Sequence, residues 1–192
     1  MPTSADVDGP VTPADIGIDG VVSVALSAHR DDRGSLSELY RRSWFPEAAP
    51  MTQANLSRSR AGVLRGMHFH RRQADFQVFA AGVAVVGLFD LRAGAPSEGR
   101  SAAIPVDAAD SALGLFIPAG VAHGFCAVTE VTLIYLVDRE FSGEDEHGIA
   151  WDDPGLGIEW PVASPTLSAR DRSNPSLAEI LRDPPRYPSP LG

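Results

Sequence analysis

The sequence contains no lysine, so its 16 permanently cationic side chains are all arginine. Without a lysine amine the chain cannot form an internal Schiff base, which excludes pyridoxal-phosphate enzymes. Any anionic ligand must therefore be held by guanidinium groups or by backbone amides.

The chain is also poor in cysteine and in long apolar runs. Cys126 is the single cysteine, so no internal disulfide can form, and the composition fits a reducing cytoplasm. We interpret Cys126 as a small buried side chain on a strand. No apolar run approaches the ~20 residues of a membrane span, and residues 1–17 lack the features of a secretory signal. We therefore expect a cytoplasmic protein that does not associate with membranes.

Acidic residues outnumber basic ones by 25 to 16, for a formal net charge of −9. This charge argues against a nucleic-acid partner, because such binding depends on cationic groups that neutralise phosphates. A phosphorylated small molecule is compatible, since a few arginines can gather locally. The length of 192 residues predicts one domain. We place it at residues 18–184, between a flexible N-terminal arm over 1–17 and a tail over 185–192.

Most of the chain consists of short runs of β-forming residues between glycine and proline turns. These runs lie within residues 18–40, 52–70, 76–100 and 101–141, with a break at Gly82. The acids Asp152, Asp153 and Glu159 lie in a glycine-rich and proline-rich stretch, where such residues usually serve in turns and caps. A helical period first emerges at residues 176–183. This pattern predicts an antiparallel sandwich or barrel followed by a short C-terminal helix.

Three histidines, His68, His70 and His123, lie in two short motifs with a defined spacing. The stretch GVLRGMHFHRRQADFQVFAAG runs from Gly62 to Gly82, and a Pro-x-Gly-x-x-His sequence follows at residues 118–123. In an extended strand His68 and His70 point to the same face, because successive side chains alternate. The side chains that can converge inside a barrel are His68, His70, Asp75 and His123.

This spacing resembles the motifs of cupins, which are double-sheet jelly rolls. The fold class that we predict is therefore an all-β cupin jelly roll (a double-stranded β-helix). In metal-binding cupins the four corresponding side chains bind a divalent cation, and a mixed imidazole and carboxylate set suits iron, manganese, nickel or zinc. The usual acid is glutamate, whereas Asp75 is one methylene shorter. The alternative is that only some of these histidines face the interior and act without metal.

Further segments extend the resemblance over nearly the whole chain. They are HRDDRGSLSE, QANLSRSRAGVLRGMHFH, IPAGVAHGF, GIAWDDPGLGIEWP and LSARD. In order and spacing they are similar to dTDP-4-dehydrorhamnose 3,5-epimerase and its dTDP-sugar epimerase relatives. The resemblance implies a homodimer that acts on a nucleotide-sugar substrate in deoxysugar biosynthesis. Its reaction would be epimerisation of a dTDP-linked 4-keto-6-deoxyhexose at C3, C5 or both, without a cofactor.

The resemblance also implies roles for individual residues. His68 corresponds to the general base and Asp171 to the carboxylate that orients it. Tyr135 corresponds to the acid that returns a proton from the opposite face, and His123 to a donor near the developing enolate. Substrate binding is implied for two phosphate-binding arginines, Arg33 and Arg65, and for the nucleotide-binding positions Glu38, Gln53 and Asn55.

Three positions depart from the family. His70 stands where the family usually has glutamine, Asp75 where it has lysine, and Phe141 where it has tyrosine. The carboxylate of Asp75 reverses a charge beside a developing enolate, which should disfavour ordinary 3,5-epimerisation. The same departures complete the metal-binding set of the cupins.

Two other hypotheses therefore stay open. One is a metal-dependent isomerase, cyclase or oxygenase on the same scaffold, with the ligands His68, His70, Asp75 and His123. The other is a catalytically silent sugar-nucleotide binder. The joint presence of His68, Tyr135 and Asp171 argues against a silent binder.

Overall fold

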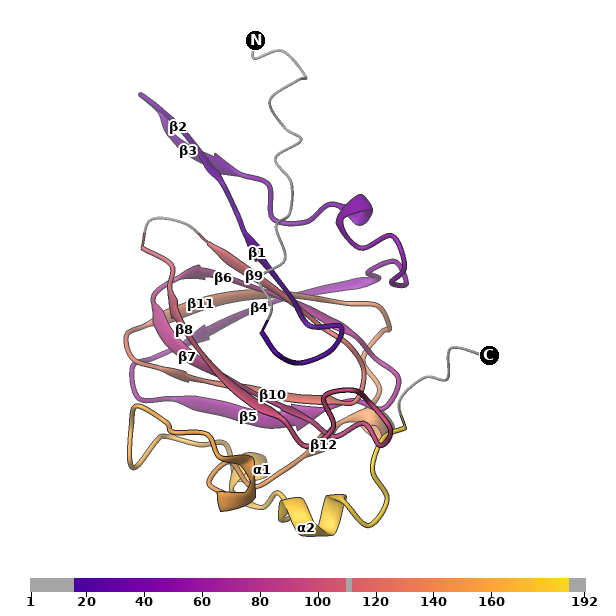
Figure 1. Ribbon diagram of the computed structural model, residues 1–192. Coiled ribbons are helices and arrows are strands. Elements are labelled where there is room, and N and C mark those ends of the chain that lie inside the picture. Colours follow the sequence, from indigo (N-terminus) through magenta and orange to yellow (C-terminus); the bar gives the residue numbers. More distant parts are fainter. Residues whose placement is uncertain (1–15, 110–111, 187–192) are drawn as a thin grey trace.

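The computed structural model describes residues 16–109 and 112–186, which form a jelly roll of two sheets stacked face to face (Figure 1). The first sheet consists, in spatial order, of β1 (Val22–Ala25), β9 (Leu113–Ile117), β6 (Asp75–Ala81), β11 (Val131–Val137) and β4 (Gln53–Ser59). The second consists of β12 (His147–Gly148), β5 (Leu64–Phe69), β10 (Val121–Ala127), β7 (Val83–Asp90) and β8 (Ser101–Asp107). All of these pairings are antiparallel, so the predicted fold class is confirmed.

The remaining elements lie around the two sheets. β2 (Ala28–Asp31) and β3 (Gly34–Ser37) pair as a hairpin that projects from the body (Figure 1). Short 3₁₀ turns occupy Arg42–Trp44, Gly143–Asp145 and Pro154–Leu156. In the part of the chain that the structure describes, the α-helices are α1 (Ala169–Arg172) and α2 (Leu177–Ile180). Within the described ranges, no helix has the length and apolar character needed to cross a membrane.

Local sequence signals account for several element boundaries. Gly82 separates β6 from β7 with φ of 94°, and a Cβ there would lie 2.0 Å from the Glu130 carbonyl oxygen, so glycine is required. Ser176 and Glu179 form a capping box at the start of α2. This helix is shorter than the predicted 176–183 and the sequence did not predict α1. Most of the arm predicted over 1–17 and of the tail predicted over 185–192 lies outside the described residues.

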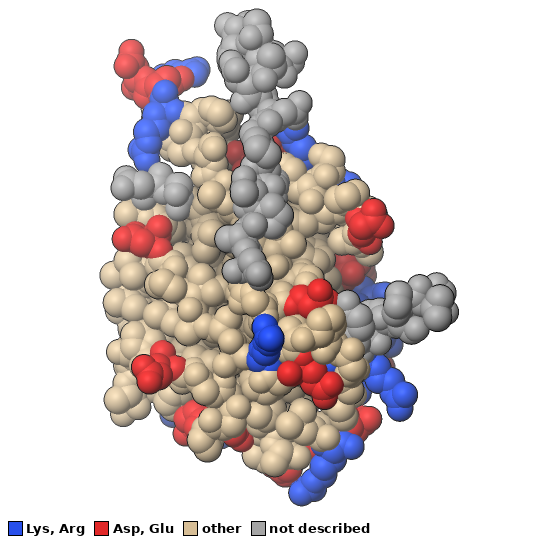
Figure 2. All heavy atoms as spheres, viewed as in Figure 1, with Lys and Arg blue, Asp and Glu red and all other residues tan. Residues whose placement is uncertain are grey.

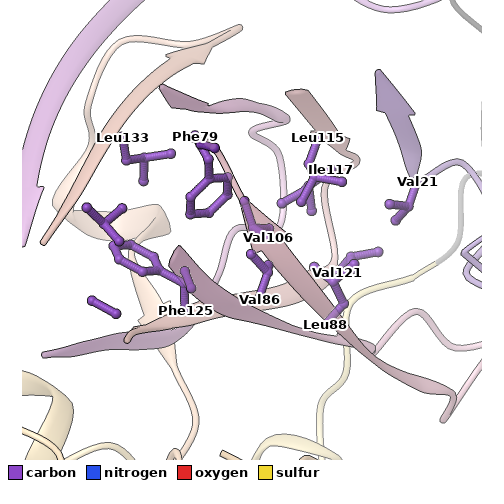
Figure 3. Close-up of a cluster of buried hydrophobic side chains, with 14 of the residues drawn as sticks. Val21, Phe79, Val86, Leu88, Val106, Leu115, Ile117, Val121, Phe125 and Leu133 are labelled. Carbon is purple, nitrogen blue, oxygen red and sulfur yellow. The ribbon is translucent and has the colours of Figure 1, made fainter. Parts of the chain in front are cut away.

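Three apolar clusters hold the layers together. The first lies between the sheets and includes Phe79, Leu88, Val106, Leu115 and Phe125 (Figure 3). A second covers the outer face of the second sheet, where residues of the C-terminal segment pack on β5. A third covers the outer face of the first sheet, where the segment around Phe45 packs on β6. Because both sheets are covered on their outer faces, strands such as β7 are apolar along their length rather than alternating.

A buried ion pair between Asp90 and Arg92 stabilises the end of β7. Asp90 is fully buried and accepts hydrogen bonds from the Arg92 guanidinium at 2.7 and 2.8 Å and from the Ser97 hydroxyl at 2.6 Å. Arg92 also donates a hydrogen bond to the Asp19 carbonyl, which connects the segment before β1 to the end of β7. Burial acts to raise the pKa of Asp90, but the bonds from Arg92 and Ser97 lower it overall, so the carboxylate is charged at neutral pH.

We expect Asp90→Ala to lower the free energy of unfolding by about 3–5 kcal/mol, because it leaves a buried guanidinium without its carboxylate. Urea denaturation followed by circular dichroism measures this change. Asp31→Ala is the matched control, since Asp31 pairs with Arg33 at an exposed position and its loss should have a much smaller effect. Equal stability of the two variants would contradict the assignment.

Candidate active site

A cavity of about 350 Å³ opens between the two sheets, beside the apolar cluster that fills the rest of the interior. The second sheet contributes Arg65, His68 and His123 to its wall, and the first sheet contributes Gln53, Asn55, Asp75, Gln77 and Tyr135. β4 shows how the sequence builds this wall. Its polar residues Gln53, Asn55 and Ser57 line the cavity, while the intervening positions are exposed, as the two-residue period of a strand requires.

His68 forms a close pair with a carboxylate that lies 103 residues away in the sequence. Its Nε2 lies 2.6 Å from Oδ1 of Asp171, which is buried on α1 beneath β5 (Figure 1). Burial acts to raise the pKa of Asp171, but the hydrogen bond from His68 lowers it overall. Asp171 is thus an ionised acceptor of the Nε2 proton, and Nδ1 is the ring nitrogen left for proton transfer.

Tyr135 faces the cavity from the opposite sheet. It lies on β11, in register with Asn55 of β4 on one side and Gln77 of β6 on the other. Burial raises the pKa of its hydroxyl, and the negative charges of Asp75 and Glu146 raise it further. The phenol is therefore protonated at neutral pH. A ligand between the sheets would have the His68 imidazole on one side and a proton donor on the other.

A second group of polar side chains lies along the same cavity. His123 Nε2 lies 3.4 Å from Oδ2 of Asp75, and His70 Nε2 lies 4.0 Å from Oδ1 of the same carboxylate. His123 is the register partner of His68 across β10 and β5. His68 and His70 both line the cavity, as the alternation predicted, but they contact different carboxylates. Of the four predicted metal ligands, the structure gathers His70, Asp75 and His123 into one group and places His68 against Asp171.

The predicted substrate-binding residues divide into two sets. Gln53, Asn55 and Arg65 line the cavity. Arg33 and Glu38 do not, because the hairpin of β2 and β3 carries that segment away from the body. Arg33 pairs with Asp31 among the charged side chains at the hairpin tip (Figure 2), and Glu38 pairs with Arg41.

Sequence reasoning missed two charged residues of the cavity. Glu146 and Arg170 both line it and form an ion pair with each other. Arg170 directly precedes Asp171 in the LSARD segment, and this position beside a predicted catalytic residue could have identified it. Glu146 belongs to an acidic loop in which nothing distinguishes a site residue from a solvated one. Asp153, by contrast, has the predicted capping role, since it accepts hydrogen bonds from the backbone amides of Gly155 and Leu177.

The fold and the cavity define a cupin-type protein equipped for acid–base chemistry, with a His–Asp pair on one wall and a protonated tyrosine on the other. The family model described as dTDP-4-dehydrorhamnose 3,5-epimerase matches residues 15–179. The chain therefore belongs to the dTDP-4-dehydrorhamnose 3,5-epimerase family.

Similar proteins agree with this assignment. The chain is 34% identical over 176 residues to a dTDP-4-dehydro-6-deoxyglucose 3-epimerase of Streptomyces sp, with 87% of this chain and 89% of the relative covered. It superimposes with a TM-score of 0.81 and 35% identity on NovW, a 4-keto-6-deoxy sugar epimerase of Streptomyces spheroides, over 89% and 90% of the two chains. RmlC of Legionella pneumophila, solved with dTDP-4-keto-L-rhamnose, matches with a TM-score of 0.82 and 28% identity over 90% and 96%. These matches support epimerisation rather than a cyclase or oxygenase reaction.

Proposed function

We propose that this protein epimerises a dTDP-linked 4-keto-6-deoxyhexose at C3, C5 or both. The observation that carries the proposal is the placement of His68 with Asp171 on one wall of the cavity and Tyr135 on the other. Relatives that share this fold are epimerases of such sugars, and one of them was solved with dTDP-4-keto-L-rhamnose.

In this proposal the reaction is a proton removal followed by a proton return. The C–H bond next to the ketone breaks, its proton passes to the His68 imidazole, and its electron pair forms the enolate. Asp171 stabilises the resulting imidazolium. Tyr135 then gives its proton to the same carbon from the other side of the ring, so that the configuration inverts, and solvent restores both groups. No cofactor takes part in this sequence.

The nucleotide part of the substrate would be held by Arg65, Gln53 and Asn55, which line the same cavity. Arginine can grip a diphosphate through paired hydrogen bonds. These three assignments, like the cytoplasmic location expected from the cysteine content, are part of the proposal.

We also propose that the protein is a homodimer. β4 is an edge strand whose outward face leaves Leu56 exposed, and the projecting hairpin leaves Leu36 exposed. Exposed strand edges with apolar side chains favour association. Arg33 and Glu38 lie outside the cavity of their own subunit. In a dimer they could instead contact a substrate in the cavity of the second subunit. Analytical ultracentrifugation tests this point, and a monomer at micromolar concentration would refute it.

The test of the proposed function is deuterium incorporation. The enzyme is incubated in D₂O with dTDP-4-keto-6-deoxyglucose, and proton NMR follows loss of the C3 and C5 signals and formation of the epimer. Exchange at one or both carbons is expected, since each turnover returns a proton that derives from solvent. If neither carbon exchanges faster than in buffer alone, the proposal is wrong.

A further inference from the structure

Three buried donor groups from three different elements converge at one place in the cavity wall. They are Nε2 of His70 in the loop after β5, a carboxylate oxygen of Asp75 at the start of β6, and Nε2 of His123 on β10. Their ligand atoms all lie within 4.8 Å of one another. The side chains are only 6%, 4% and 8% exposed, respectively. Removing a carboxylate and two imidazoles from water costs free energy unless each group is paired, so the partners of each donor are informative.

Backbone carbonyls orient both imidazoles toward the group. His70 Nδ1 lies 2.8 Å from the Asp145 carbonyl, and His123 Nδ1 lies 3.2 Å from the Val121 carbonyl. A carbonyl oxygen only accepts, so each Nδ1 carries a hydrogen and each Nε2 is directed at Asp75. An imidazole held by a carbonyl at one nitrogen and presenting the other is the usual arrangement of a metal-binding histidine. Asp75 is oriented as well, since Gln73 donates to its Oδ1 at 2.8 Å.

The spacing within the group differs from that of the neighbouring acid–base pair. His68 and Asp171 are 2.6 Å apart, which is a direct hydrogen bond, whereas Asp75 lies 3.4 Å from His123 and 4.0 Å from His70. Charge-assisted hydrogen bonds are usually about 2.7–2.9 Å long. Ligands bound at about 2.0–2.2 Å to one cation are themselves separated by about 3–3.5 Å. The 3.4 Å distance between His123 and Asp75 therefore matches that of two ligands of one cation, whereas the 4.0 Å distance between His70 and Asp75 is somewhat longer.

Glu146 adds a fourth donor at the edge of the group. Its Oε1 lies 3.6 Å from His70 Nε2, while its other oxygen pairs with Arg170. Glu146 and Asp75 together place two carboxylates beside two imidazoles. Because Arg170 already pairs with Glu146, a divalent cation would chiefly balance the charge of Asp75.

We propose that His70, Asp75 and His123 bind one divalent first-row transition metal, with Glu146 as a fourth ligand. Two imidazole nitrogens with carboxylate oxygens favour iron, manganese, nickel or zinc over magnesium or calcium. This ligand set differs from the one predicted from the sequence, because Glu146 replaces His68. His68 is paired with Asp171 instead and can act as a base. When bound, the cation would add positive charge to this part of the cavity wall, and the proton transfers proposed for His68 and Tyr135 do not require it. Metal binding itself does not depend on the proposed epimerase activity.

The test is metal binding by the full chain. Protein purified without chelator is analysed for metal content, then stripped with EDTA, dialysed and titrated with Co²⁺ while calorimetry and the visible absorption spectrum are recorded. We expect one equivalent of Co²⁺, absorption bands of a nitrogen and oxygen ligand set, and a rise in melting temperature with metal concentration. His70→Gln and Asp75→Asn should each weaken Co²⁺ binding by about 100-fold or more.

His68→Gln is the matched control, because it removes a histidine of the same cavity that lies outside the group. It should bind Co²⁺ as the unchanged protein does, and a loss of binding equal to that of His70→Gln would overturn the assignment of ligands. Circular dichroism of the metal-free variants verifies that each one folds. Absence of stoichiometric binding of Co²⁺, Zn²⁺, Ni²⁺, Mn²⁺ and Fe²⁺ to the folded protein would overturn the site itself. Deuterium exchange measured in EDTA reports on the epimerase separately, so the two proposals can fail independently.

Discussion

His68→Gln is expected to lower the rate of epimerisation by about 10²–10⁴-fold, with little change in the affinity for the nucleotide sugar. The imidazole is the group placed to remove the proton, and general-base catalysis contributes a factor of this size. Glutamine fills a similar volume but cannot accept a proton at neutral pH. The measurement is the initial rate of deuterium incorporation at C3 and C5, combined with calorimetric binding of dTDP.

Two further variants test this explanation. Asp171→Asn keeps the shape of the buried partner of His68 but removes its charge, so an intermediate loss of rate is expected. His29→Gln, which changes an exposed histidine on β2, serves as the control and should exchange at the rate of the unchanged protein. If His68→Gln and His29→Gln exchange equally fast, His68 is not the base.

Tyr135→Phe is expected to separate proton removal from inversion. The variant retains His68 and Asp171, so the enolate still forms and deuterium still enters the sugar. Without the phenol on the opposite wall, the proton returns mainly from the His68 side, which restores the original configuration. We expect formation of the epimer to fall by about 10²-fold or more, the usual contribution of a general acid, while exchange falls much less.

Proton NMR measures both quantities in one sample, because the epimer and the exchanged substrate give different signals. Tyr40→Phe is the matched control, since Tyr40 packs against Phe76 in the cluster on the outer face of the first sheet. It should leave the ratio of exchange to inversion unchanged. An equal fall of exchange and inversion in Tyr135→Phe would show that Tyr135 is not the acid.

Much of the fold could be predicted from local pattern. Turn signals such as Gly82 and the alternation in β4 depend on neighbouring residues, so a single sequence displays them. The helices were harder to predict, because α1 and α2 have four residues each and a run of that length has almost no periodicity. Their stability comes from packing against β5 and from caps rather than from propensity.

The contacts of His70 and Asp75, which depart from the family, could be determined only from the tertiary structure. In the sequence, His70 and Asp75 were two unusual residues of a predicted four-ligand site. The structure directs His70 toward Asp75 and His123, and it directs His68 toward Asp171. One strand thus supplies a histidine to an acid–base pair, and the loop that follows it supplies another to a separate buried group.

By itself the sequence determined the family, the jelly-roll class, the absence of lysine chemistry and the residues available for acid–base catalysis. These properties depend on residue type and on spacing along the chain. The tertiary structure decided which carboxylate each histidine meets, that Glu146 and Arg170 enter the cavity, and that Arg33 and Glu38 lie outside it. Contacts of this kind join residues as many as 103 positions apart, and their geometry depends on how the sheets and the C-terminal segment pack.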